Sequence, residues 1–181
     1  HIKSSIGVIE SVLKENKISY EFIIVDDGSR DNTWAELKSL TDTNPRVTAL
    51  RLSRNFGKES ALCAGLTYAA GDMVLVMDAD LQHPPELIPE MVKAWRDGAD
   101  VVDCIKNSRG KENPFYRICA KFFYYILLKT ADIDLENASD FKLMDRAVVE
   151  AWKQLPERTT FFRGMASWVG FERKQLRFDV A

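Results

Sequence analysis

Two carboxylates follow a short apolar stretch in the middle of the chain and are the first candidates for chemistry. Residues 73–77 are apolar without alternation, and Asp78, Asp80 and Gln82 follow them at alternate positions. An unbroken apolar run of this length is typical of a strand buried on both faces of a parallel sheet. Oxygen ligands suit Mg²⁺ or Mn²⁺, and such an ion in turn suits a diphosphate. The pattern therefore predicts a metal site where a buried strand ends.

An Asp-x-Asp triplet is weak evidence by itself. A second one, at Asp132 and Asp134, follows a predicted helix, and we interpret it as a solvated loop. The first triplet is distinguished by the apolar strand before it and by the prolines at 84 and 85. These prolines predict a helix over 86–95, because the first turn of a helix tolerates proline.

A second acidic site is predicted at the end of the first visible strand, residues 20–25, where Asp26 and Asp27 stand side by side. Adjacent carboxylates repel each other unless hydrogen-bond donors meet them. A nucleobase N–H and ribose hydroxyls would be such donors, so we expect this pair to contact a ligand. Ser29, Asp31 and Asn32, which follow Gly28, are also of the types that cap a helix, and capping is the simpler interpretation for them.

Arg54 and Lys58 flank a glycine-containing loop before a predicted helix at 59–70. The start of a helix favours anions, so this loop could bind a phosphate. A solvated turn is an equally good interpretation, and the spacing is not that of a P-loop.

The elements that would position these residues are four successive strand–helix units. Such units predict a mostly parallel, doubly wound α/β sheet with right-handed crossovers and helices on its faces. A helix at 1–16, with an apolar stripe, precedes them. The predicted strands are 20–25, 47–52, 73–77 and 100–105.

The pattern is weaker after Lys106. We expect a polar loop at 107–113, helices at 146–155 and 161–169, and an edge strand at 173–180. A short strand at 138–144 would carry Asp140. The helix predicted at 115–129 combines aromatic and basic residues, which fits either a membrane interface or a core helix with snorkelling cations.

Composition limits the class of protein. The chain has 181 residues, 46% of them hydrophobic and 29% charged, which is enough for one globular domain. A formal net charge of −2 gives no support to broad nucleic-acid binding. The three cysteines have no zinc spacing and suit a reducing compartment. No G-x-G-x-x-G follows a strand, which argues against a dinucleotide-dependent oxidoreductase. We find no signal peptide and no apolar run long enough to cross a bilayer.

Five segments together resemble one known family. They are IVDDGS at 24–29, NFGK at 55–58, DADLQHPP at 78–85, SDFKLMDR at 139–146 and FRG at 162–164. In this order and spacing they are similar to the GT-A glycosyltransferases of family two. The branch they resemble most loads a sugar onto a polyprenyl phosphate, as dolichol-phosphate mannose synthases and bactoprenol glucosyl transferases do.

The resemblance implies a single catalytic domain over 1–181, with a nucleotide- and metal-binding half at 1–105 and an acceptor-binding half at 106–181. The donor would be a nucleotide-diphospho-sugar, and the cofactor Mg²⁺ or Mn²⁺. The implied nucleotide-binding residues are Asp26, Asp27, Ser29, Asn55, Lys58 and Asp78, and the implied metal ligands are Asp78, Asp80 and Gln82. The implied catalytic residues are Asp80 and Asp140, and those for the acceptor phosphate are Arg117, Lys121 and Arg163.

A phosphate acceptor is already anionic near pH 7, with a second pKa of about 6. Asp140 is therefore expected to orient sugar or metal more than to abstract a proton. In relatives that glycosylate a hydroxyl, this position holds a general base, and their Gln-x-x-Arg-Trp motif is not found here. A family member acting on a saccharide hydroxyl, a sugar nucleotidyltransferase and a non-catalytic binding module are the alternatives.

The resemblance also bears on the protein as a whole. Family members begin with a strand that would lie just before residue 1, and this branch continues into amphipathic or transmembrane helices. We therefore expect this segment to be a soluble, cytoplasmic part of a protein that acts at the cytoplasmic side of a membrane. A homo-oligomer is possible, and nucleic acid is not an expected partner.

Overall fold

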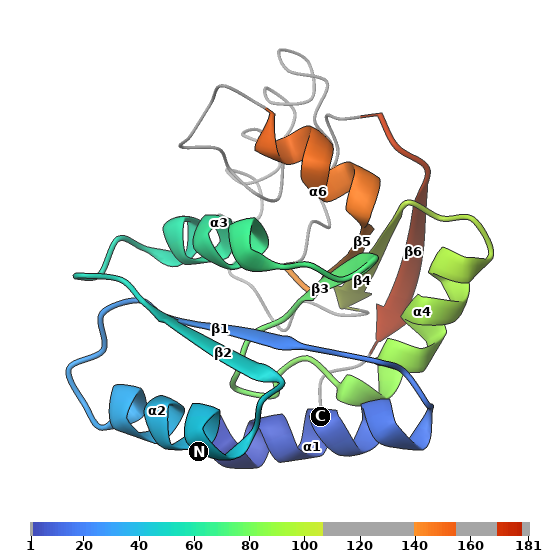
Figure 1. Ribbon diagram of the computed structural model, residues 1–181. Helices are drawn as coiled ribbons and strands as arrows, with labels where there is room; N and C mark the ends of the chain where they lie inside the picture. Colours follow the sequence, from blue (N-terminus) through green and yellow to red (C-terminus); the bar gives the residue numbers. More distant parts are fainter. Residues whose placement is uncertain (1, 107–139, 155–169, 179–181) are drawn as a thin grey trace, which may run out of the picture.

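A computed structural model describes residues 2–106, 140–154 and 170–178 of the chain. Its first part alternates helices and strands, as predicted (Figure 1). The elements up to the middle of the chain are α1 (Ile2–Glu15), β1 (Phe22–Asp26), α2 (Thr33–Thr43), β2 (Val47–Arg51), α3 (Lys58–Tyr68), β3 (Met73–Val76), the short η1 (Pro85–Leu87), α4 (Ile88–Arg96) and β4 (Val101–Lys106). Those that follow are β5 (Lys142–Asp145), α6 (Arg146–Lys153) and β6 (Arg173–Phe178).

Local sequence explains where several helices begin and which face they bury. The apolar stripe of α1 places Ile6, Ile9 and Leu13 in the interior. The side chain of Asp145 caps α6 by accepting the backbone N–H of Ala147 at 2.8 Å. Helix α4 ends before Gly98, whose φ of +110° is a conformation that favours glycine.

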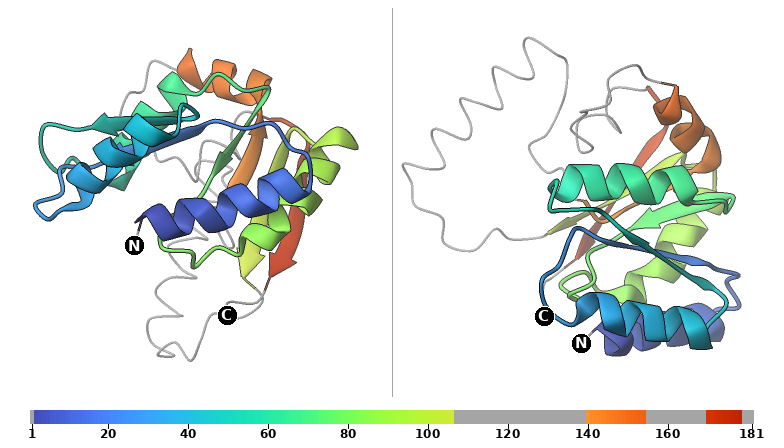
Figure 2. Two further views of the ribbon diagram at one scale, coloured as in Figure 1. Left: turned by 60° about the horizontal axis from the view of Figure 1, so that its bottom comes forward. Right: turned by 60° about the vertical axis from the view of Figure 1, so that its left-hand side comes forward.

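Strands β1 and β2 form a parallel pair between helical layers. Their register places Phe22 opposite Val47 and Asp26 opposite Arg51. Helix α3 packs on β1 and α2 packs on β2, so that α3 covers one face of the pair and α1 and α2 lie on the other (Figures 1 and 2). The predicted strand–helix alternation is confirmed in this half of the chain.

The second sheet has the order β3-β5-β4-β6 and is mixed rather than parallel throughout. Strand β6 runs parallel to β4 and lies at the edge, as predicted. Strand β5 runs antiparallel to both β3 and β4, and its insertion between them departs from the expected succession of parallel neighbours. The repeating strand–helix spacing stops after β4, so the pattern contained no information about the direction of β5.

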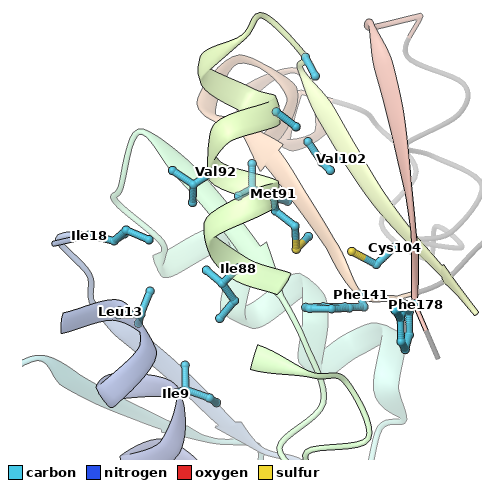
Figure 3. Packing of buried hydrophobic residues seen from close by; sticks show 13 residues of the cluster. Ile9, Leu13, Ile18, Ile88, Met91, Val92, Val102, Cys104, Phe141 and Phe178 are labelled. Carbon is cyan, nitrogen blue, oxygen red and sulfur yellow. The ribbon is translucent and has the colours of Figure 1, made fainter. Parts of the chain in front are cut away.

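The hydrophobic core lies between α4, α1 and the four-stranded sheet (Figure 3). Val102 and Cys104 of β4 are completely buried, and α4 covers them with Met91 and Val92. The equally buried Val101 belongs to a second cluster, with Val148 and Val149 of α6. Strand β3, by contrast, has only its last residue, Val76, fully buried. The expectation that the 73–77 strand is buried on both faces was therefore wrong, because β3 lies at the edge of its sheet and β4 occupies the interior.

Several predicted elements fall outside the described residues. They are the loop at 107–113, the aromatic helix at 115–129, the Asp132–Asp134 triplet and the helix at 161–169. In the part of the chain that the structure describes, no helix has both the length and the apolar character needed to span a membrane.

Candidate active site

The carboxylate of Asp27 joins the loop after β1 to the loop after β2 by hydrogen bonds. Its two oxygens accept the backbone N–H groups of Phe56 and Gly57, both at 2.8 Å. The neighbouring Asp26 is buried, accepts the N–H of Ser29 at 2.9 Å and pairs with Arg51 at 3.3 Å. Protein donors therefore meet both carboxylates, a role for this acidic pair that the sequence reasoning missed. Nucleotide contact by this pair remains a prediction.

Gly28 lets these two loops approach each other closely. Its φ is +73°, and a Cβ atom placed there would lie 2.6 Å from the carbonyl carbon of Arg54 and 2.7 Å from the nitrogen of Asn55. Real Cβ atoms essentially never approach backbone so closely, and the conformation is itself unfavourable for other residues.

We expect Gly28→Ala to lower the free energy of unfolding by about 2 kcal/mol, since the loops must separate and a strained φ is imposed. The measurement is urea unfolding followed by circular dichroism. Gly7→Ala is the matched control: Gly7 lies inside α1 with nothing within 4 Å of its Cβ position. That change should stabilise the protein by about 0.5–1 kcal/mol. Equal effects of the two changes would contradict this account of Gly28.

A lysine connects the end of β3 with the residues just before β5. Lys58, the first residue of α3, places its Nζ 2.7 Å from Oδ1 and 2.9 Å from Oδ2 of Asp78. The same Nζ lies 2.8 Å from Oδ2 of Asp140. Burial alone would lower the pKa of Lys58, but hydrogen bonds to Asp140 and Asp78 outweigh burial and raise it. The carboxylates of Asp78 and Asp140 thus meet at the ammonium group of Lys58. The sequence analysis placed all three residues in the site, although they come from three separate segments.

The turn after β3 is held by contacts within its own motif. Asp80 accepts the backbone N–H of Gln82 at 3.0 Å, and both side chains are exposed. His83 is buried; its Nδ1 accepts the backbone N–H of Asp78 at 3.2 Å, and its ring stacks on Phe141 at 4.8 Å between centroids. His83 thereby links the acidic turn to the residue beside Asp140. The sequence reasoning missed it, although a histidine between two acids and two prolines was a visible signal.

The arrangement suits a hard divalent cation. Within residues 2–106, 140–154 and 170–178, no three His, Cys, Asp or Glu side chains form a metal-binding group by themselves. Mg²⁺, however, commonly binds one or two carboxylates together with substrate phosphates and water. Asp78 and Asp140 already share one cation, the Lys58 ammonium, and their donor atoms are the oxygens that such a metal prefers. The residues present therefore fit Mg²⁺ or Mn²⁺ bound together with a diphosphate.

The remaining predicted site residues are placed as follows. Ser29 and Asn55 lie in the two loops that Asp27 joins, and Asn55 is exposed. The three residues proposed for the acceptor phosphate, Arg117, Lys121 and Arg163, lie outside the described residues.

The fold is that of the GT-A glycosyltransferases. It is similar to a mannosyltransferase from Pyrobaculum calidifontis, solved in complex with GDP-Man and Mn²⁺, with a TM-score of 0.61 and 19% identity over 96% of this chain and 51% of that one. S. aureus TarS (residues 1–349) is also similar, with a TM-score of 0.56 and 18% identity over 86% of this chain and 48% of that one. The model of the family "Glycosyl transferase family 2" matches residues 6–152, and the chain belongs to that family.

Relatives with higher identity carry more specific names. An uncharacterized glycosyltransferase of Synechocystis sp. is 47% identical over 93% of this chain and 53% of its own length. The bactoprenol glucosyl transferase of Shigella phage SfV is 43% identical over 83% of this chain and 49% of its own length. This chain therefore spans about half the length of the curated relatives it matches.

Proposed function

We propose that the protein transfers glucose from UDP-glucose to the phosphate of a polyprenyl phosphate, with inversion at the anomeric carbon. The observation that carries this proposal is the convergence of Asp78 and Asp140 on one cation at the end of β3. Contacts from Asp27 and Lys58 link the loops after β1, β2 and β3 into one site. Similarity to bactoprenol glucosyl transferases supports the choice of sugar and acceptor.

The donor half of the site would hold the nucleotide and its diphosphate. Asp26, Asp27, Ser29 and Asn55 would lie around the nucleoside, and Lys58 near the diphosphate. Asp78, Asp80 and Gln82 would hold Mg²⁺ or Mn²⁺, with Asp140 beside them. The metal would act as a Lewis acid, neutralising charge on the departing UDP.

The acceptor half needs cations and little base catalysis. An oxygen of the lipid phosphate would form the new bond to the anomeric carbon while the bond to UDP breaks and UDP leaves with the electron pair. That oxygen is already anionic, and Oδ2 of Asp140 is hydrogen-bonded to Lys58. Asp140 would therefore orient the sugar or the metal rather than abstract a proton. Arg117, Lys121 and Arg163 would bind the lipid phosphate, and the forked geometry of arginine suits it. Because this acceptor is a membrane lipid, the enzyme would act at the cytoplasmic surface of a membrane.

The first test is isothermal titration of UDP into the protein with Mn²⁺, repeated with EDTA. We expect binding that depends on the metal and is lost in Asp80→Ala. The transfer assay then offers labelled UDP-glucose with polyprenyl phosphate in detergent, and with a free saccharide as the alternative acceptor. Label in the lipid phase supports the proposal. Transfer to the saccharide alone would favour a hydroxyl-directed enzyme instead, and metal-dependent UDP binding without transfer to either acceptor would favour a binding module.

A further inference from the structure

Lys58 contacts Asp78, a proposed metal ligand, and Asp140, which lies beside the proposed metal site. All three N–H groups of a lysine ammonium can donate hydrogen bonds. In Lys58 the ammonium lies 2.7 and 2.9 Å from the two oxygens of Asp78 and 2.8 Å from Oδ2 of Asp140. These are the distances of charge-assisted hydrogen bonds, and they leave the ammonium seated between the two carboxylates.

A divalent metal could not share these oxygens with the ammonium in its present position. Mg²⁺ lies about 2.1 Å from its oxygen ligands, so it would occupy nearly the same space as the Lys58 Nζ. The two cations would also repel each other at that separation. Metal binding to Asp78 therefore requires Lys58 to withdraw.

The exposure of the three side chains shows which of them is able to move. Asp140 is 4% exposed, whereas the side chain of Lys58 is 44% exposed and that of Asp78 is 39% exposed. The lysine can therefore swing out on its flexible stem while the buried carboxylate stays in place. A withdrawn ammonium needs a new anionic partner, and the diphosphate of the donor would supply one at the start of α3.

We propose that Lys58 occupies the metal's position in the free enzyme and that the nucleotide diphosphate draws it away, so that metal and nucleotide bind as a pair. This inference rests on the proposed function and specifies how its donor site is regulated. By linkage, each of the two ligands raises the affinity for the other by the same factor. Free enzyme would then bind the metal weakly and would not hold it without a donor.

The test compares Mn²⁺ binding by the wild-type protein and by Lys58→Met, with the electron paramagnetic resonance signal of free Mn²⁺ as the readout. In the absence of nucleotide, Lys58→Met should bind Mn²⁺ about tenfold more tightly, a factor within the usual range of coupling between sites. In the same variant, UDP should bind more weakly and should improve Mn²⁺ affinity less than in the wild type. Opposite changes in the two affinities are the signature of a displaced cation, and a merely structural lysine would not produce them.

Two further variants test whether the effect depends on the position of the positive charge. Lys93→Met removes an exposed lysine from α4 and should leave both affinities unchanged. Lys58→Arg keeps a cation between the carboxylates, so its Mn²⁺ affinity should stay low. Thermal unfolding of each variant checks that the fold is retained.

The possible failures of the inference and of the proposed function can be told apart. Unchanged or weaker Mn²⁺ binding by Lys58→Met, in a protein whose wild type binds Mn²⁺ with UDP, would overturn the role given to Lys58 alone. Absence of Mn²⁺ binding by the wild type, even with UDP present, would overturn the metal-dependent function and this inference with it.

Discussion

Replacing Asp80 with alanine should lower the rate of glucosyl transfer by on the order of a thousandfold, a loss typical of removing a group that stabilises transition-state charge. Without this carboxylate, the metal on the diphosphate would be poorly held when charge develops on UDP. The measurement is kcat/KM for UDP-glucose at saturating Mn²⁺. Asp42→Ala, which removes an exposed carboxylate from α2, is the matched control and should leave the rate unchanged.

Asp140→Asn should lower the rate of glucosyl transfer much less than Asp80→Ala does, by about tenfold to a hundredfold. Asparagine keeps an oxygen within reach of Lys58, which lies 2.8 Å from the present carboxylate. The acceptor phosphate needs no base, so a lost negative charge here affects orientation rather than proton transfer. If both variants lose activity equally, and the wild-type rate falls steeply at acid pH, then Asp140 is a general base and our mechanism is wrong.

The second large effect concerns stability and a buried ion cluster. Asp103 of β4 and Lys142 of β5 are both almost completely buried, with 3.3 Å between Asp103 Oδ1 and Lys142 Nζ. Arg173 of β6 donates from Nε to the other oxygen of Asp103 at 3.1 Å. One carboxylate thus serves two cations from strands on either side of β4.

Asp103→Asn should lower the free energy of unfolding by about 3–5 kcal/mol, because it removes the shared partner of two cations. Lys142→Met is the contrasting variant. It keeps the length of the side chain, leaves Asp103 paired with Arg173 and removes the desolvation cost of the ammonium, so its effect should be small or stabilising. Urea unfolding measures both, and a loss in Lys142→Met as large as that in Asp103→Asn would contradict this ranking.

The pH dependence of stability gives an independent check on Lys142. Burial lowers its pKa below the ordinary value of 10.5 despite the nearby carboxylate. The unfolded chain therefore holds this proton more tightly than the native protein does. Stability contributed by this group should rise with pH between the lowered native pKa and 10.5. Lys142→Met should lack this rise.

The sequence predicted the local elements well because their signals are local. The apolar stripe of α1, the apolar run of β3 and the prolines before α4 each indicate structure within a few residues. The family resemblance added the fold and the acidic motifs. The spacing of the elements did not indicate that β5 lies between β3 and β4.

The contacts that were missed join residues far apart in the chain. Asp27 meets the N–H groups of Phe56 and Gly57 only because β1 and β2 are parallel neighbours. Lys142 of β5 meets Asp103 only because β5 lies beside β4. Such pairings depend on tertiary packing, whereas periodicity and motif spacing report only on sequence neighbours.

The central position of β5 also bears on how the chain is made. Strands β3 and β4 leave the ribosome first, yet each is joined to the other through β5, which begins at Lys142, whereas β4 ends at Lys106. These two strands can therefore be joined only after residue 145 has emerged, and long-range pairing of this kind is slow. Asp140 arrives immediately before β5. The joining of β3 to β4 and the delivery of the second carboxylate to Lys58 are thus one event, so a nascent chain lacks the Asp78–Asp140 pair until β5 has paired.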